Sequence, residues 1–152
     1  MPDAIASTAT LELTYRFDTS PERVFDAWVT PALCDWLGPA TVSKCEVVAM
    51  DVRVGGRYHL RMHMPDRVHD ATGEYREIDR PRRLVMTFDG NKAQFGGHFS
   101  TLLTVTFRPD GTGTLMTFRQ EGLQRGEMFD GFKQGWSAAG NSFDKLARLL
   151  AR

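Results

Sequence analysis

Histidine is the residue type in this chain that most readily binds metals or moves protons near neutral pH. His59 and His63 are four positions apart, in a stretch where apolar and polar residues alternate as they do in a β-strand. Two strand residues at that spacing share a face but lie ~13 Å apart, so one metal ion cannot bridge them. We expect both imidazoles to face solvent, and His69 and His98 to lie near loop ends. The sequence therefore predicts no metal site and no cofactor.

Three glutamates, Glu74, Glu77 and Glu121, are the carboxylates closest to the expected interior. A buried carboxylate has a raised pKa and can serve as a general base. The alternative is that each forms an ion pair with a neighbouring arginine, such as Arg76, Arg119 or Arg125. The chain contains no nucleophile-elbow, zinc-protease or phosphate-loop motif. We therefore assign no catalytic residue from the sequence.

Cys34 and Cys45 are the only cysteines, and their spacing does not form a Cys-x-x-Cys redox pair. A disulfide between them is one interpretation, but we favour two reduced thiols in a cytoplasmic protein, because structural disulfides are rare in that compartment. The first residues carry no basic segment followed by an apolar one, so we expect no secretory signal. No stretch approaches the ~18 apolar residues of a membrane-spanning helix, so we expect no insertion into membranes.

The 152 residues are enough for one domain, 1–152, with its own hydrophobic core. Hydrophobic residues make up 41% and charged residues 25%, which is typical of a folded globular protein. The 19 basic side chains are balanced by 19 acidic ones, which excludes the strong global positive field typical of nucleic-acid-binding proteins. Ten Phe, three Trp, three Tyr and seven Met supply an interior rich in bulky apolar side chains.

The chain opens with a predicted strand at 10–17, where apolar and polar residues alternate. A helix is predicted next, because Ser20 can cap its start and Pro21 suits the first helical position. This helix ends at Thr30-Pro31, and a second short helix continues to Trp36. The pattern then predicts six more strands, at 42–50, 57–64, 72–78, 84–88, 99–108 and 112–120. The glycine-containing segment 90–98 is predicted to be a mobile loop that acts as a lid.

The last segment predicts one long helix over 128–151, roughly 35 Å in length. Its apolar residues, among them Phe132 and Trp136, recur at helical spacing and form one face. Gly131, Gly135 and Gly140 lie inside this helix. We interpret these glycines as points of close approach to a sheet or as a small bend.

Together these elements predict an α+β domain in which a curved antiparallel sheet wraps around the long C-terminal helix. The bulky side chains favour a hydrophobic cavity between sheet and helix, and a filled core is the alternative that periodicity leaves open. The candidate cavity residues are Trp28, Trp36, Tyr58, Leu60, Met62, Phe88, Phe99, Met116, Phe118, Phe132, Trp136 and Phe143.

Several blocks of the sequence resemble the SRPBCC or START-like superfamily, and more narrowly its activator of heat-shock-protein-90 ATPase (AHSA-type) domains. The opening of the family is resembled by residues 17–28 (FDTSPERVFDAW) followed by 36–39 (WLGP). Its middle blocks are resembled by 54–58 (VGGRY) and 73–81 (GEYREIDRP), and its last helix by 135–136 (GW) and 143–146 (FDKL). The resemblance covers about positions 10–150, and the order and spacing of the blocks make it specific.

The resemblance implies the helix-grip (START-like, Bet v 1-like) fold, with two short helices after the first strand and an apolar cavity. It places Trp136 on the helix facing the sheet, which makes Trp136 the strongest candidate for a ligand contact. It implies binding of a hydrophobic small molecule more strongly than any reaction, so binding without catalysis is our first hypothesis. The alternatives are a polyketide cyclase/aromatase-type enzyme, using Glu74, Glu77 or a cavity tyrosine, and a stress-related co-chaperone-like interaction module.

The family's namesake co-chaperone carries an additional N-terminal domain that supplies much of its ATPase stimulation. This chain begins almost at its first predicted strand, which weakens the expectation of an interaction with heat-shock protein 90. The sequence leaves a homodimer open. The expected partner is therefore a hydrophobic small-molecule ligand, with no nucleic acid.

Overall fold

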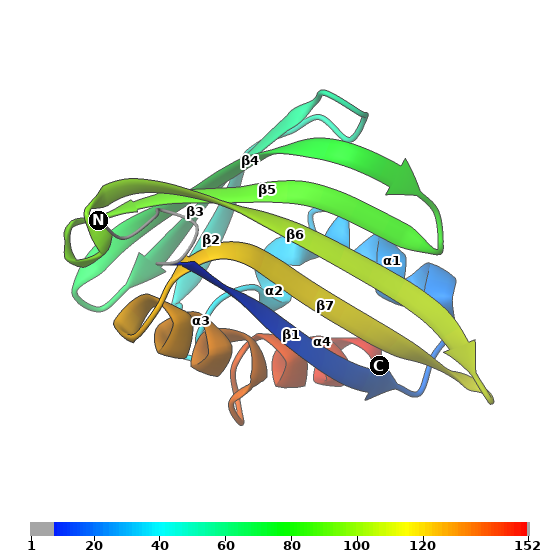
Figure 1. Ribbon diagram of the computed structural model, residues 1–152. Coiled ribbons are helices and arrows are strands. Elements are labelled where there is room, and N and C mark those ends of the chain that lie inside the picture. Colours follow the sequence, from blue (N-terminus) through cyan, green and yellow to red (C-terminus); the bar gives the residue numbers. More distant parts are fainter. Residues whose placement is uncertain (1–7, 152) are drawn as a thin grey trace.

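Seven strands form one antiparallel sheet in the computed structural model, which describes residues 8–151. The strands lie in the spatial order β1-β7-β6-β5-β4-β3-β2, so only the β1–β7 pair joins strands that are not consecutive in the chain. Their bounds are β1 (Thr8–Phe17), β2 (Lys44–Met50), β3 (Arg57–Met64), β4 (Arg67–Asp79), β5 (Arg83–Lys92), β6 (Gly97–Asp110) and β7 (Gly113–Gln124). Figure 1 shows the strong curvature of this sheet. The predicted α+β architecture with a curved antiparallel sheet is confirmed.

The two short helices predicted after the first strand are present as α1 (Pro21–Trp28) and α2 (Leu33–Trp36). Ser20 caps α1, because its hydroxyl oxygen accepts a hydrogen bond from the Arg23 amide. Pro21 occupies the first helical position, where its missing N–H costs no hydrogen bond. The helix therefore begins where the capping residues predict.

The C-terminal segment forms two helices, α3 (Glu127–Ser137) and α4 (Ser142–Leu150), so the prediction of one continuous helix over 128–151 is wrong. Gly140 has a φ of +82°, a left-handed conformation that interrupts an α-helix. The Asp144 carboxylate accepts a hydrogen bond from the Gly140 N–H and so fixes the start of α4. Figure 1 shows both helices along the side of the sheet formed by β1 and β7, joined by a loop.

Several strands extend beyond their predicted bounds, and the extensions of β4 and β5 bear on the site. β4 begins at Arg67 rather than at Thr72, and β5 continues to Lys92. The segment predicted as a mobile lid loop, 90–98, is therefore the end of a paired β5–β6 hairpin, closed by the short 3-10 turn η1 (Ala93–Phe95). Gly96 and Gly97, with φ of +87° and +98°, reverse the chain there. The glycines therefore mark a tight turn, and the hydrogen-bonded pairing of β5 with β6 continues up to Lys92 and Gly97.

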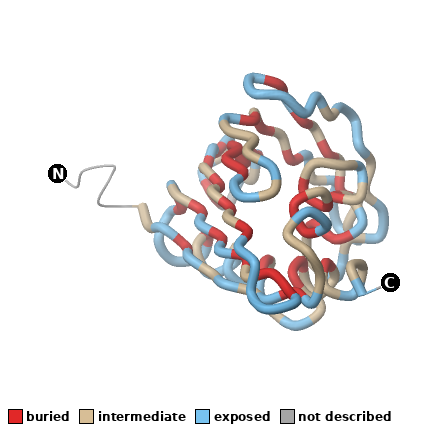
Figure 2. The backbone as a smooth tube through the Cα atoms, turned by 90° about the vertical axis from the view of Figure 1, so that its right-hand side faces the viewer, coloured by how far each residue is buried: buried red, intermediate tan, exposed pale blue. Residues whose placement is uncertain are grey.

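Aromatic side chains from all four helices meet on the concave face of the sheet. The Trp28 ring of α1 lies 4.8 Å from the Trp36 ring of α2 and 6.0 Å from the Trp136 ring of α3, between centroids. The Phe118 ring of β7 lies 4.7 Å from Trp136 and 5.5 Å from the Phe143 ring of α4. Such aromatic pairs contribute ~0.5–1.5 kcal/mol each beyond the burial of their area. In Figure 2 buried positions alternate with more exposed ones along the strands, as a one-sided core requires.

A disulfide joins Cys34 of α2 to Cys45 of β2, so the prediction of two reduced thiols is wrong. The two Cα atoms are 5.3 Å apart, which is within the range that a disulfide spans. This proximity is a product of the tertiary fold, since the chain leaves α2 and returns to pair as the edge strand β2. Among the described residues 8–151, no helix is long and apolar enough to cross a membrane.

Asp144 links the start of α4 to β1. Its carboxylate accepts hydrogen bonds from the Gly140 amide and from the Tyr15 hydroxyl, each at 2.9 Å. The Gly140 hydrogen bond first, and then the Tyr15 hydrogen bond, hold the pKa of Asp144 below its usual range. A carboxyl group with a lower pKa in the folded chain stabilises the fold above its unfolded pKa, and this stabilisation is lost as the pH falls through the folded pKa.

We expect Asp144→Ala to lower the free energy of unfolding at pH 7 by ~1 kcal/mol, a typical loss for a helix-capping side chain. The difference from wild type should shrink as the pH is lowered from ~5 to ~3, because the wild-type carboxylate is then protonated. Urea denaturation across this pH range measures the effect. Tyr15→Phe is the matched variant, since it removes only one of the two contacts, and should cost less. Equal stability of wild type and Asp144→Ala at pH 7 would contradict this assignment.

Candidate ligand-binding cavity

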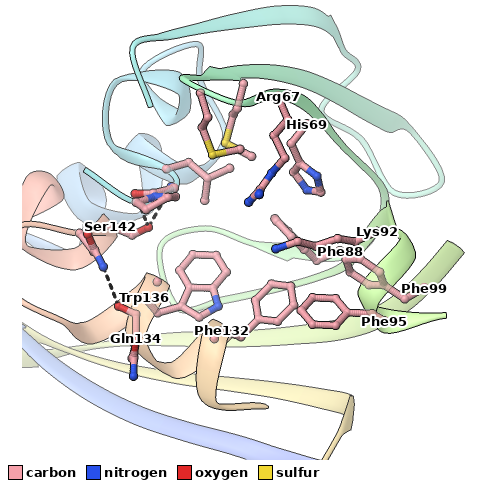
Figure 3. Close-up of a pocket in the computed structure, with 18 of the residues that line it drawn as sticks. Arg67, His69, Phe88, Lys92, Phe95, Phe99, Phe132, Gln134, Trp136 and Ser142 are labelled. Atoms are coloured by element: carbon pink, nitrogen blue, oxygen red, sulfur yellow. Dashed lines mark hydrogen bonds between the residues drawn. The ribbon is translucent and has the colours of Figure 1, made fainter. Parts of the chain in front are cut away.

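A cavity of about 370 Å³ lies between α3, the strands β3 to β5 and the loop that follows α2. Its apolar lining comes from two methionines and five aromatic residues, namely Met62, Met64, Phe88, Phe95, Phe99, Phe132 and Trp136. Residues 37–39, directly after α2, close another side. Figure 3 shows Trp136, Phe132 and Phe95 in a row along one wall, with Arg67 and His69 reaching in from the opposite side.

Two glycines of α3 keep this space open. Gly131 and Gly135 lie one helical turn apart and both line the cavity. A Cβ atom at either position would meet no other atom within 4 Å. The interpretation of these two glycines as points of close approach to the sheet is therefore wrong. Gly131 is exposed and Gly135 is half-buried, so the helix surface between them and the cavity carries no side chain at these two positions.

A chain of buried hydrogen bonds fixes α3 on the sheet. The Trp136 indole Nε1 donates to Gln120 Oε1 of β7 at 3.0 Å, and Gln120 Nε2 donates to Thr101 Oγ1 of β6 at 3.0 Å. Thr101 Oγ1 in turn donates to the Phe88 carbonyl of β5 at 2.8 Å. Gln120 has no exposed surface, so these bonds satisfy a polar group that is costly to bury alone. The indole is thereby held in one orientation beside the cavity.

The aromatic wall of the cavity is built from edge-to-face contacts. Phe88 lies 6.0 Å from Phe132 and 5.8 Å from Trp136, between ring centroids. Phe99 lies 5.9 Å from both Phe132 and Phe95. This arrangement presents ring faces and edges to the cavity, which suits a ligand with an apolar or aromatic body.

The twelve sequence-predicted cavity residues divide into two groups. Five line the cavity: Met62, Phe88, Phe99, Phe132 and Trp136. The other seven are buried in the packed core and do not reach its surface: Trp28, Trp36, Tyr58, Leu60, Met116, Phe118 and Phe143. Helices α1, α2 and α4 fill the rest of the concave face, so the side chains opposite them contact protein. Binding of a ligand by the five lining residues stays a prediction.

Sequence reasoning missed the polar part of the lining, above all Arg67, His69 and Lys92. Arg67, His69, Ala71 and Tyr75 are separated by even numbers of positions, so all four share the inward face of β4, where Ala71 and Tyr75 are buried. Lys92 shares the inward face of β5 with Phe88 in the same way. The predicted strand began too late, at Thr72, and the apolar pattern upstream gave no signal, because Val68 is exposed while the polar Arg67 and His69 face the cavity.

Burial and nearby positive charges lower the pKa of two of these groups, His69 and Lys92. Burial first, and then the charges of Arg67 and Lys92, lower the pKa of His69 below its ordinary value. Burial also lowers the pKa of Lys92, with Arg67 acting in the same direction and Glu127 opposing it. The Lys92 ammonium lies 5.0 Å from the centroid of the Phe95 ring, in cation–π contact.

The other histidines lie outside the cavity. His59 Nε2 lies 2.8 Å from Asp70 Oδ1, and His63 Nε2 lies 2.6 Å from Glu46 Oε1. Both imidazoles therefore sit on the outward face of β3, partly exposed and paired with carboxylates, while His98 is exposed on β6. Within residues 8–151, no three His, Cys, Asp or Glu side chains are arranged to hold a metal ion.

The three glutamates considered for acid–base chemistry also lie outside the cavity, each beside an arginine. Glu74 Oε1 lies 2.7 Å from Arg76 Nε, and Glu77 Oε2 lies 3.0 Å from Arg83 Nε. Glu121 Oε2 lies 3.7 Å from Arg119 Nε. Among the described residues that line the cavity, Glu127, the first residue of α3, is the one with a carboxylate side chain.

Comparison with solved structures shows the same fold in bacterial proteins. A protein from Chromobacterium violaceum is 29% identical, with a TM-score of 0.83 over 94% of this chain and 97% of that one. The AHSA1 protein from Silicibacter pomeroyi is 24% identical, with a TM-score of 0.73 over 94% of this chain and 98% of that one. A protein from Arthrobacter aurescens is 20% identical, with a TM-score of 0.77 over 97% and 92% of the two chains. A search of curated proteins gave no match.

A comparison with protein-family models matches residues 18–151 to the family described as "Activator of Hsp90 ATPase homolog 1-like protein". The match runs from the end of β1 to the end of α4 and so includes every element that lines the cavity. It confirms the family resemblance of the sequence blocks. The chain belongs to the family of Activator of Hsp90 ATPase homolog 1-like proteins.

Proposed function

We propose that the protein binds an apolar small molecule in the cavity beside α3. The observation that carries this proposal is the open space next to Gly131 and Gly135, bounded by an aromatic wall. A volume of about 370 Å³ falls within the ~300–1,000 Å³ typical of small-molecule pockets. Helix propensity favours alanine over glycine by ~1 kcal/mol at such positions, so two glycines here cost stability while keeping the space open.

Release of water from the aromatic wall supplies the driving force for this binding. Apolar surface removed from water contributes ~25 cal/mol per Å², so a ligand that covers several rings gains several kcal/mol. The rings need little rearrangement, because the Trp136 indole is already held by Gln120 and the neighbouring rings pack against it. A preformed wall of this kind loses little conformational entropy on binding.

Binding rather than catalysis is the function that the geometry supports best. The carboxylates considered as general bases, Glu74 and Glu77, are paired with arginines outside the cavity. Tyr58 of β3 and Tyr75 of β4 are buried in the core and are not among the residues that line the cavity. No contact among the described residues supports a cyclase-type reaction. None supports an interaction with heat-shock protein 90 either.

Filling the cavity from α3 tests the proposal. We expect N-phenyl-1-naphthylamine, a neutral probe that fluoresces in apolar surroundings, to bind the wild-type protein saturably with one site. Gly135→Leu places an apolar side chain in the cavity and should weaken this binding by ~10-fold or more. The same substitution should leave the melting temperature unchanged or raise it, because leucine favours a helix more than glycine does.

Lys133→Leu is the matched control, since Lys133 is exposed on the same helix and does not line the cavity. This control should bind the probe as the wild-type protein does. Absence of saturable binding to the wild type would contradict the proposed function. If a folded Gly135→Leu variant bound the probe as tightly as the wild type, the probe would bind outside the cavity and the proposed site would be wrong.

A further inference from the structure

The mouth of the apolar cavity is lined by three basic side chains from two neighbouring strands. Arg67 and His69 lie on the inward face of β4, and Lys92 lies on the inward face of β5. Gly90 of β5 makes room for His69 and for Phe99, because a Cβ atom there would lie 3.1 Å from His69 Cε1 and 2.6 Å from Phe99 Cζ. Figure 3 shows all three basic side chains directed toward the same space above the aromatic wall.

The charge at this mouth matches one negative charge on a ligand. Arg67 and Lys92 are cationic, Glu127 is anionic, and His69 is held mostly neutral at pH 7 because burial lowers its pKa. These lining groups carry two positive charges and one negative charge, which leaves one positive charge. Asp66 also contacts Arg67, at 3.6 Å, but its side chain is 75% exposed and it does not line the cavity.

We propose that the cavity binds an amphipathic organic monoanion, a carboxylate in its natural form, with the anionic group between Arg67 and Lys92. This inference rests on the proposed function and adds the chemical class of the ligand. The guanidinium donates paired N–H groups in a plane that matches a carboxylate, and the ammonium adds a second charge-assisted donor. The apolar body then lies against Phe88, Phe132 and Trp136, where the cavity offers no other charge.

His69 makes this recognition depend on pH. Arg67 of β4 and Lys92 of β5 disfavour the charged imidazole, while Asp70 next to it in β4 favours it. Glu127 of α3 faces Lys92 from the other side of the cavity. A bound anion favours the imidazolium and so raises the pKa of His69, which means that binding takes up a proton. Affinity for an anion therefore rises as the pH falls from ~7.5 to ~5.5.

Two probes with one skeleton test the anionic site. 1-Anilinonaphthalene-8-sulfonate differs from N-phenyl-1-naphthylamine by its sulfonate, and both report binding by fluorescence. For each variant we compare the affinity for the sulfonate probe with the affinity for the neutral probe. We expect this ratio to fall by ~10-fold in Arg67→Gln, and by a similar factor in the separate variant Lys92→Gln. Lys133→Gln removes an equal charge from the outside of α3 and should leave the ratio as in wild type.

The carboxylate is tested by displacing the neutral probe with decanoate and with decan-1-ol, which have the same chain length. Decanoate should compete more strongly with the wild type than with Arg67→Gln, whereas decan-1-ol should compete equally with both. A ratio of probe affinities that neither cavity substitution changes would overturn the anionic site while leaving apolar binding intact. Failure of the neutral probe to bind the wild type would instead overturn the proposed function.

The proton uptake is tested with the sulfonate probe, which stays anionic over the whole range. Its affinity should increase by ~3-fold or more between pH 7.5 and pH 5.5 in wild type, and this increase should be lost in His69→Gln. Affinity for the neutral probe serves as the reference at each pH. An increase that persists in His69→Gln would assign the pH dependence to another group and contradict the role of His69.

Discussion

The hydrogen-bonded chain from Trp136 through Gln120 and Thr101 to the Phe88 carbonyl is the constraint on which the cavity depends. It ties α3 to three adjacent strands, and every link lies in the buried interior, where an unpaired polar atom costs ~1–3 kcal/mol. A purely apolar contact would allow α3 to slide or rotate until the empty space closed. Directional hydrogen bonds instead fix the indole, and with it the face of α3 that carries Gly131 and Gly135.

The break between α3 and α4 divides the concave face into a filled part and an open part. After Gly140, α4 places Phe143 against Phe118 and packs the sheet with side chains. Before the break, α3 has Gly131 and Gly135 beside the cavity, and the space between this helix and the sheet stays open. The same division explains why only some of the predicted aromatic residues reach the cavity, since the side chains under α1, α2 and α4 are covered. An apolar wall and a basic mouth then give the cavity two chemically different ends.

Much of the fold was accessible from the sequence because it is encoded locally. Alternation along 10–17 and the capping pair Ser20-Pro21 determine structure within a few residues, and both predictions are confirmed. The helix break escaped detection because apolar spacing continues across it, and the conformation of Gly140 depends on Asp144 and Tyr15. The disulfide and the basic mouth depend on contacts between distant segments. The apolar pattern upstream of Thr72 would have placed Val68 inward, whereas the structure leaves Val68 exposed and directs His69 into the cavity. The proximity of His69 to Lys92 depends on the register of β4 and β5.

Heteronuclear NMR of the wild-type protein, titrated with N-phenyl-1-naphthylamine, tests most directly that the space beside α3 is a ligand site. We predict that the largest chemical-shift changes occur at the Trp136 indole N–H, at the amides of 131–136 and at those of 88–92. The amides of 143–150 in α4, beyond the cavity-lining Ser142, should change little. Saturable shifts that leave the Trp136 indole and 131–136 unmoved would contradict the assignment of the cavity as the binding site.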